Sequence, residues 1–448
     1  MPSPLSDAEL ASVLAHHWAI DCLGMTLRQQ GTDALKYSGP GSVRHGSEGT
    51  LEYVLYDTTA AAPDLISFGG QAGEWLRPED FFVLSATDQW GREWTAEWVS
   101  ADTRTTAGEP GAVVYGGIRE VWCRFPRDSE NSGALLHGPF LVSVPVNART
   151  ETQVSEAGRE SRGFALDVWR SSSALGEIVL KKDGDVLRAR LERSEAALPP
   201  DITIRLEESL SFVLGAQLKW EVEQTRSGGV FQILLRSGVE AQRKPRVRPP
   251  IEANAISANP DRALLLDNIL AYLTSTASHD GEYHPLAQVL LRVLRSSGTG
   301  IEDEALVLST AVESVIQANF GSLLKPTSRL VNAIDSALAH FDQWCGPSDI
   351  RERIKGAVRR IKESNASEAL KKLEAQGVLR VGQAQKWREL RNPVAHGARS
   401  PGDIQGFVTR CDAVYDLLTR LVFQLVGFKG LYTNHTTKGW PLEPFPSV

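Results

Sequence analysis

The feature that most constrains the fold is a change of hydrophobic pattern at a segment rich in arginine and proline. Residues 243–250 read RKPRVRPP, and this alternation of proline with basic residues cannot continue a helix or a central strand. Before the segment, apolar and polar residues alternate in short runs; after it, apolar residues recur at helical spacing. The sequence therefore predicts an α+β protein, in which an antiparallel, sandwich-like β-rich domain precedes an all-α helical bundle.

The β-rich domain is predicted to span residues 1–240. A helix over 7–29, with Ser6 as its N-cap, should precede the strands. The sequence KDGD at 182–185 is typical of a hairpin turn between two of them. Strands are expected at 51–56, 94–99, 112–115, 120–125, 140–146, 164–169, 177–181, 186–191, 202–206, 218–225 and 231–235.

Residues 241–260 are predicted to be a linker or a strap across the domain boundary, and residues 261–448 to be helical. The linker's positive charge could also contact a polyanion. The helical part holds 22 lysines and arginines against 20 aspartates and glutamates, whereas the rest holds 26 against 35. The acidic excess therefore lies in the N-terminal half. Helices are expected at 261–274, 286–294, 302–323, 328–344, 349–374, 381–390 and 404–426.

Composition places the chain among multidomain cytoplasmic proteins. Its 448 residues suffice for two or three domains with cores of their own. No run of about 18 apolar residues predicts a membrane span, and the N-terminus lacks the pattern of a signal peptide. The four cysteines are scattered, without paired metal spacing, which favours a reducing compartment.

The string RNPVAHG at 391–397 is the candidate site. Arg391 offers a planar cation that matches phosphate oxygens, and His396 has a side chain that exchanges protons near neutral pH. Pro393 predicts a helix start, with Asn392 as the N-cap and close to His396 four residues later. A phosphate could dock at such a helix N-terminus. The alternative is a polar kink between helices, in which His396 is merely hydrogen-bonded.

Arg-Asn-x3-His-Gly after a run of amphipathic helices resembles the HEPN superfamily, specifically its Apea-like branch. The resemblance covers about residues 258–448, and this string is its specific element. The segment 306–316 is similar to the family helix with an inward-pointing acid, here Glu313. Trp387 and Leu390 precede the motif on an apolar and basic helix, as is usual in this family. The segments 427–432 and 439–441 are similar to the tail that often follows the last helix of the family. The family toxins that a partner nucleotidyltransferase inactivates carry a tyrosine two residues after the histidine, where this chain has Ala398. Inactivation by such a partner is therefore not expected.

The resemblance implies a metal-independent endoribonuclease without a cofactor. Arg391 would clamp the phosphate, Asn392 would orient the site, and Glu313 would hold Arg391 or His396. Two chains paired about a twofold axis would each supply a His396, one as base and one as acid. The products would be a 2′,3′-cyclic phosphate and a 5′-hydroxyl. Candidate RNA-binding residues are Lys386, Arg388 and Arg399, with the helical basic stripe of Arg351, Lys355, Arg359 and Lys362.

The implied biology is a regulated toxin that cuts cellular RNA, tRNA or another RNA of translation, as an anti-phage effector. The acidic N-terminal domain would be a sensor or brake that responds to a phage-derived or small-molecule trigger. Two alternatives stay open: a non-catalytic HEPN module that only dimerises, and a carbohydrate- or ligand-binding protein led by the β-rich domain. The basic stripe also has a plain explanation as a solvated helix face.

Two further clusters are expected to have structural roles. His16, His17, Asp21 and Cys22 share the predicted first helix, but without further ligands in view they predict packing and solvation rather than a metal site. Eight of the eleven tryptophans fall in the β-rich half, where rings could stack on a flat ligand. Filling the core is the preferred interpretation.

Overall fold

The computed structural model has two compact units. The first comprises Met1–Glu207 with Leu218–Gln242, and the second comprises Glu208–Gln217 with Arg243–Val448. The predicted boundary near residue 240 falls beside the division at Gln242. Residues 150–154, 160–164, 360–362 and 392–395 are described by their backbone only. The structure describes residues 3–30, 36–46, 49–58, 77, 80–104, 111–127, 131–145, 150–154, 160–164, 167–194, 196–199, 201–238, 247–275, 282–325, 328–362, 366–395 and 404–446.

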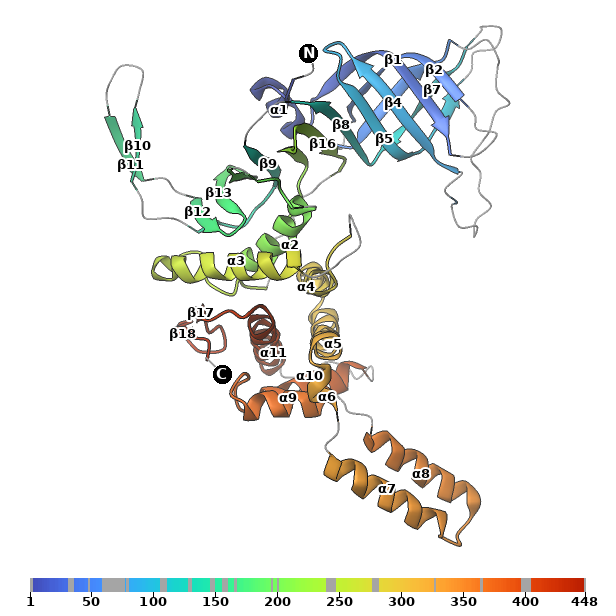
Figure 1. Ribbon diagram of the computed structural model, residues 1–448, viewed down its shortest axis with the longest axis vertical. Coiled ribbons are helices and arrows are strands. Elements are labelled where there is room, and N and C mark those ends of the chain that lie inside the picture. Colours follow the sequence, from blue (N-terminus) through green and yellow to red (C-terminus); the bar gives the residue numbers. More distant parts are fainter. Residues whose placement is uncertain are drawn as a thin grey trace. The chain divides into compact units, whose positions relative to one another are not determined.

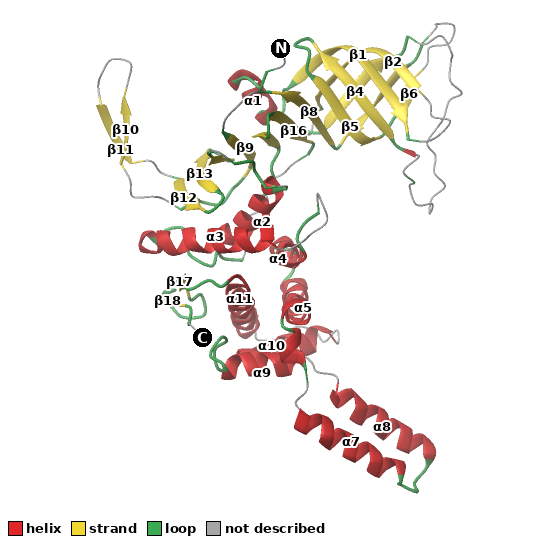
Figure 2. Cartoon of the chain, viewed as in Figure 1, coloured by secondary structure: helices red, strands yellow, loops and turns green. Residues whose placement is uncertain are grey.

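The architecture is α+β, as the sequence predicts, with an antiparallel β-sheet region followed by helices (Figures 1 and 2). The main sheet of the described chain runs in the order β12-β13-β14-β9-β15-β16-β8-β5-β4-β1-β2-β3-β7-β6. It curls enough that β5 also contacts β7. A separate hairpin pairs β10 (Thr150–Val154) with β11 (Glu160–Phe164). The strands of the main sheet are β1 (Ala19–Gln29), β2 (Lys36–His45), β3 (Leu51–Tyr56), β4 (Phe82–Asp88), β5 (Glu93–Val99), β6 (Asp102–Arg104), β7 (Val113–Ile118), β8 (Glu120–Pro126), β9 (Ser132–Pro139), β12 (Val168–Ser173), β13 (Gly176–Asp183), β14 (Val186–Arg193), β15 (Val222–Ser227) and β16 (Val230–Arg236).

Alternating side chains give the sheet one buried face. On β4, for example, Leu84 and Ala86 are buried whereas Ser85 and Thr87 are exposed, as the period of two in a strand requires. The predicted hairpin is confirmed: Asp183 pairs with Val186, and Gly184 takes the positive φ of a tight turn, +59°. The buried face holds Met25, Leu27, Tyr37, Val43, Tyr53, Leu55, Leu84, Trp94, Val114, Val121 and Ile233.

The predicted helix over 7–29 is wrong beyond its second turn. Helix α1 (Asp7–Leu14) has the predicted N-cap, because Ser6 and Glu9 form a capping box. His16 then takes φ +56°, which ends the helix, and the next residues form β1. The four residues proposed to share a helix are therefore split between a turn and a strand.

Three strand predictions are also wrong. The strand predicted at 164–169 instead covers the end of β11 at Phe164, a turn at Asp167 and the start of β12 at Val168. Residues 140–145 are not in a strand, since β9 ends at Pro139. The segment predicted as a strand at 202–206 begins helix α2 (Ile202–Leu214), whose residues 205–214 are buried on all sides. Its buried residues mix apolar side chains with polar ones (Arg205, Glu207, Glu208, Ser209 and Ser211), so the segment shows no single apolar stripe and periodicity alone did not separate helix from strand.

Helices dominate the second unit, in which α5, α10 and α11 pack against one another and α4 packs on α5. The predicted helix over 302–323 is divided into α5 and α6, and that over 349–374 into α8 and α9. Two short strands, which the sequence did not predict, follow the last helix. The elements are α3 (Asn259–Ser275), α4 (Pro285–Ser296), α5 (Ile301–Asn319), α6 (Gly321–Leu324), α7 (Ser328–Asp342), α8 (Ser348–Lys362), α9 (Ala366–Ala375), α10 (Gln383–Ala395), α11 (Ile404–Val426), β17 (Leu431–Thr433) and β18 (Leu442–Pro444).

The end of the predicted linker is bound to the C-terminal segment rather than free. Thr433 N–H donates to the carbonyl of Pro250 at 2.9 Å, and Glu252 N–H donates to Thr433 Oγ1 at 3.0 Å. The Arg248 guanidinium lies 3.7 Å from the centre of the Trp440 ring. Residues 247–252 therefore form a strap within the helical unit, and the segment at 241–246 lies outside the described residues.

We expect the β-rich unit to lose stability in acid through His45. Its ring is buried, neither ring nitrogen has a hydrogen-bond partner among the described residues, and the His16 ring lies 5.3 Å away. Burial, with the nearby His16 and His17, lowers the pKa of His45 from 6.5 to about 4. Because the unfolded chain binds the proton more tightly, stability is lost as the pH falls from about 6.5 to about 4, by as much as about 3 kcal/mol.

The measurement is the urea midpoint at pH 7.5 and at pH 4.5. In His45→Leu, which cannot titrate at this position, the difference between the two midpoints should shrink. His340→Leu, which removes an exposed imidazole of the helical unit, is the matched control and should behave as wild type. An unchanged pH dependence in His45→Leu would contradict the assignment.

Candidate functional site

The candidate site centres on Arg391, which the structure joins to Glu313. The Nε and Nη2 atoms of Arg391 lie 3.0 and 2.8 Å from the same Glu313 carboxylate oxygen. Both side chains remain partly exposed, 39% for Arg391 and 27% for Glu313. An arginine has five N–H donors, so this contact leaves donors for a further anion. The pair is thus a fixed cation that stays open to solvent.

A buried contact one helical turn earlier explains why these two side chains meet. The indole N–H of Trp387 donates to the carbonyl of Ser309 at 3.0 Å, and both residues are buried. Glu313 follows Ser309 by four residues, and Arg391 follows Trp387 by four, so both contacts advance by one turn along α5 and α10. The Arg391 guanidinium also lies 5.6 Å from the Trp387 ring centre. The tryptophan therefore sets the position of the ion pair.

The predicted helix start at Asn392 is wrong. Helix α10 continues through Asn392 and Pro393 to Ala395, so Asn392 lies in its last turn instead of capping a new helix. Proline removes only one backbone hydrogen bond this close to the helix end, and the buried Trp387 and Leu390 hold the preceding turns against neighbouring helices. The side chain of Asn392 and the whole of His396 lie outside the described residues.

The candidate RNA-binding residues fall into two groups. Lys386 and Arg388 are exposed on α10, within two turns of Arg391. Arg351 and Arg359 lie on α8, which packs against α7 as a helical hairpin (Figure 1). Arg399 and the side chain of Lys362 lie outside the described residues.

Lys355, the centre of the basic stripe, is engaged by acids. Its Nζ lies 2.6 Å from Asp342 of α7 and 3.1 Å from Glu352, and only 12% of its side chain is exposed. Its hydrogen bond and charge lower the pKa of the Asp342 carboxyl, with further help from Arg351 and Arg359. Part of the stripe therefore closes the α7–α8 hairpin and is less available to a phosphate.

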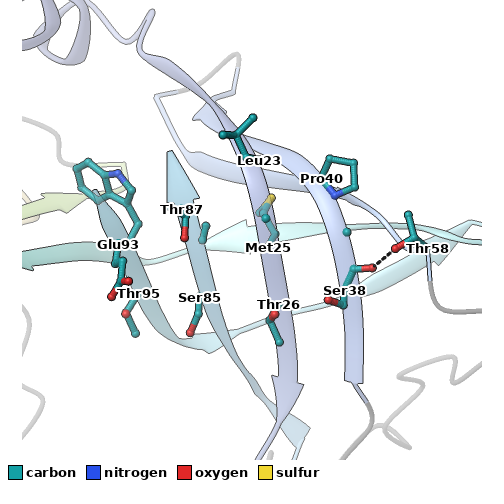
Figure 3. A pocket seen from close by; sticks show the side chains of 14 residues that line it. Leu23, Met25, Thr26, Ser38, Pro40, Thr58, Ser85, Thr87, Glu93 and Thr95 are labelled. Atoms are coloured by element: carbon teal, nitrogen blue, oxygen red, sulfur yellow. Dashed lines mark hydrogen bonds between the residues drawn. The ribbon is translucent and has the colours of Figure 1, made fainter. Parts of the chain in front are cut away.

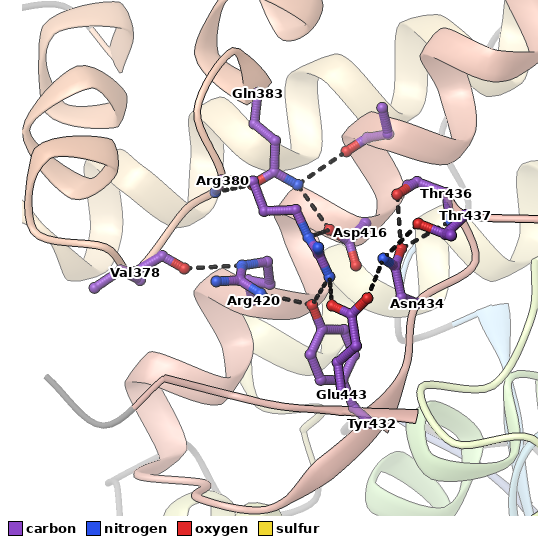
Figure 4. A network of polar contacts seen from close by, with 11 residues as sticks. Val378, Arg380, Gln383, Asp416, Arg420, Tyr432, Asn434, Thr436, Thr437 and Glu443 are labelled. Carbon is purple, nitrogen blue, oxygen red and sulfur yellow. Dashed lines mark hydrogen bonds and ion pairs between the residues drawn. The ribbon is translucent and has the colours of Figure 1, made fainter. Parts of the chain in front are cut away.

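A polar network that the sequence did not reveal fixes the start of α10 (Figure 4). Gln383, the first residue of α10, donates from Nε2 to Asp416 at 2.7 Å and accepts at Oε1 from the Arg380 N–H, also at 2.7 Å. Arg380 in turn reaches Asp416, Tyr432 and Glu443, at 3.3, 2.5 and 2.7 Å. The helix that presents Arg391 is thus anchored at its other end to the C-terminal segment.

Tyr432 is the hub of this network. Its hydroxyl oxygen accepts from Arg380 and, at 2.5 Å, from Arg420, whose Nε donates to the carbonyl of Val378 at 2.8 Å. Burial raises the pKa of Tyr432, and Asp416 adds to the increase. Burial alone would lower the pKa of Arg380, but Tyr432, Glu443 and Asp416 outweigh it and raise that pKa. Arg380 therefore stays charged, and both arginines donate to this hydroxyl.

Two histidines, an aspartate and a cysteine near the N-terminus, His16, His17, Asp21 and Cys22, do not share a helix. His16 Nε2 contacts Glu221 at 2.9 Å, and Cys22 is buried in β1. In the described part of the chain, no group of three or more His, Cys, Asp and Glu side chains is arranged to hold a metal ion. The same residues include no helix long and apolar enough to cross a membrane.

Of the tryptophans in the β-rich unit, Trp18, Trp94, Trp169 and Trp220 are fully buried. They fill the core, as the sequence analysis preferred. Trp90 and Trp98 are about half exposed, and Trp75 lies outside the described residues.

Comparisons with protein-family models, with curated proteins and with solved structures found no match to this chain.

We expect Tyr432→Phe to lower the free energy of unfolding of the helical unit by about 2–3 kcal/mol. The substitution keeps the ring but leaves N–H groups of two guanidiniums without their acceptor, one of them in a buried side chain. The loss should appear as an earlier urea transition of the helical signal in circular dichroism.

Tyr272→Phe is the matched control. Its hydroxyl donates to Asn319 Oδ1 at 3.2 Å in the same unit, without a charged partner in that bond, so its removal should cost less, about 1 kcal/mol. Equal losses in the two variants would argue against the special role of Tyr432.

Proposed function

We propose that the helical unit is a metal-independent endoribonuclease of the HEPN kind, acting on tRNA or another RNA of translation. The observation that carries the proposal is the partly exposed Arg391, which is the first residue of the string RNPVAHG and forms an ion pair with Glu313. An arginine that is oriented by a carboxylate and still open to solvent suits a phosphate, because its remaining donors form charge-assisted hydrogen bonds.

RNA supplies its own nucleophile, the 2′-hydroxyl, so the protein must move protons and stabilise charge. His396 of one chain removes the 2′ proton as O2′ attacks phosphorus. His396 of a second chain, related by a twofold axis, gives a proton to the departing O5′. Arg391 stabilises the negative charge that builds up on the phosphorane oxygens. The products are a 2′,3′-cyclic phosphate and a 5′-hydroxyl, with Asn392 orienting the site and Glu313 positioning Arg391.

RNA approaches along α10 in this proposal. Lys386 and Arg388 are exposed there and would contact backbone phosphates on either side of the cleaved bond. Arg399, just beyond the motif, would add to them. Arg351, Arg359 and Lys362 would make weaker, more distant contacts, because the neighbouring Lys355 is already paired with Asp342.

The biological role we propose is that of a cytoplasmic toxin, kept inactive until infection and then stopping translation as an anti-phage effector. The acidic excess of the N-terminal half supports a restraining role for that half, since a negative field opposes the approach of RNA. Release would follow from a phage-derived or small-molecule trigger.

A second candidate is a non-catalytic module that dimerises through its helices. The contacts of Arg391 with Glu313 and Trp387 favour it, because they would also serve as a clamp between α5 and α10 without any substrate. The two candidates differ in one respect: only the nuclease requires His396.

We expect His396→Ala and Arg391→Ala each to lower RNA cleavage at least 100-fold without unfolding the protein. Glu313→Gln, which keeps the shape but removes the charge that orients Arg391, should lower cleavage about 10-fold. The measurement is the rate of cleavage of total RNA on gels, with mapping of product ends. His340→Ala, at an exposed histidine of α7, is the control and should leave the rate unchanged. A folded His396→Ala variant as active as wild type would favour the non-catalytic candidate.

Cleavage should persist in EDTA, because the two histidines and Arg391 supply the acid, the base and the cation that the reaction needs. The measurement compares initial rates with and without chelator, and then after Mg²⁺ or Mn²⁺ is added back. Activity that disappears in chelator and returns with metal would overturn the metal-independent mechanism.

A further inference from the structure

The β-rich unit has a hollow of about 620 Å³ on one face of its sheet, over β2, β1, β4 and β5 (Figure 3). Four side chains that line it are cross-strand neighbours. Thr26 pairs with both Ser38 and Ser85, and Ser85 pairs with Thr95. Because strands lie about 4.8 Å apart, these hydroxyls form a row about 14 Å long across four strands.

The rest of the lining defines its chemistry. Thr87 pairs with Glu93 in the neighbouring strand, and Thr58 donates its hydroxyl to the carbonyl of Ser38 at 3.0 Å. The described residues that line it together provide six hydroxyl groups and one carboxylate, and they include no lysine or arginine. Such a surface has no cation to attract a phosphate, whereas each hydroxyl both donates and accepts hydrogen bonds.

A β-bulge shapes one side of the hollow. The pairing of β1 shifts register between Cys22 and Met25, and this places two successive residues, Leu23 and Gly24, on the exposed side. Leu23 is 78% exposed, an unusual state for a leucine, and it lies beside the hollow with Pro40 (Figure 3). The bulge therefore sets an apolar edge next to the row of hydroxyls.

Gly24 leaves open space above the sheet. Among the described residues, a Cβ atom built at Gly24 would meet nothing within 4 Å, and its backbone is not in the left-handed region. The neighbouring Gly39 differs, because a Cβ there would meet the carbonyl oxygen of Tyr56. A larger residue would thus fit at position 24 without strain, and the space above it is free for a ligand.

We propose that this hollow binds a neutral saccharide of two or three sugar units. A row of hydroxyls about 14 Å long matches the hydroxyl groups of successive sugar rings, and Glu93 can accept from a pair of them. Leu23 and Pro40 contact the apolar C–H faces of the rings. The volume lies within the range of sites for small ligands. The site lies within the β-rich unit and does not depend on the proposed nuclease.

The test uses the full-length protein on an array of neutral and phosphorylated mono- to tetrasaccharides, followed by titration calorimetry with the saccharide that binds best. Gly24→Phe should fill the hollow and weaken binding at least 10-fold while leaving the circular dichroism spectrum unchanged. Gly117→Phe is the matched control, because a Cβ at that exposed glycine of β7 also meets nothing closer than 4.0 Å. It should bind as wild type does.

Thr26→Val and Thr95→Val test the row itself, since each removes one hydroxyl at nearly constant shape. Each should weaken binding about 3- to 10-fold, the usual effect of one hydrogen bond. Thr103→Val, on β6 outside the hollow, should have no effect. The proposal is overturned if wild type binds no neutral saccharide, if it prefers phosphorylated ones, or if folded Gly24→Phe binds as tightly as wild type.

Discussion

The helical unit depends on one buried acceptor, the hydroxyl oxygen of Tyr432. Two guanidiniums, those of Arg380 and Arg420, donate to it, and through them it joins α11, the residues before α10 and the C-terminal strands. Two like charges so close would repel each other without the nearby carboxylates Asp416 and Glu443. The position of α10, and so of Arg391, follows from this balance of charges.

Much of the fold followed from the sequence, because periodicity reports which face of an element is buried. β3 and α11 begin and end at the predicted residues, and β16 is longer than predicted by one residue at each end; each has clear alternation or a clear apolar stripe. The errors have physical causes. The helix predicted over 7–29 stops where His16 adopts a left-handed conformation, and α2 was missed because it is buried all round.

The candidate site was less accessible to sequence reasoning. The string at 391–397 indicated Arg391, but its contact with Glu313 was suggested only by a family resemblance. In the structure, the hydrogen bond between Trp387 and Ser309 brings Arg391 and Glu313 together. These two residues are 78 positions apart, so no pattern in the local sequence predicts the contact. Tyr432 was noted as part of a tail, yet nothing in its neighbourhood predicted two arginine partners. Long-range polar networks of this kind depend on tertiary packing, which periodicity does not describe.

The strap at 247–252 has a consequence for synthesis of the chain. Glu252 bonds to Thr433, 181 residues later, so the strap stays open on the ribosome until Thr433 has emerged. At about 5–20 residues per second, that delay is about 10–40 s. The anchoring of α10 by Tyr432 is completed at the same point of synthesis. If the helical unit cuts RNA of translation, the order of synthesis keeps each new copy incomplete while its own message is still being read.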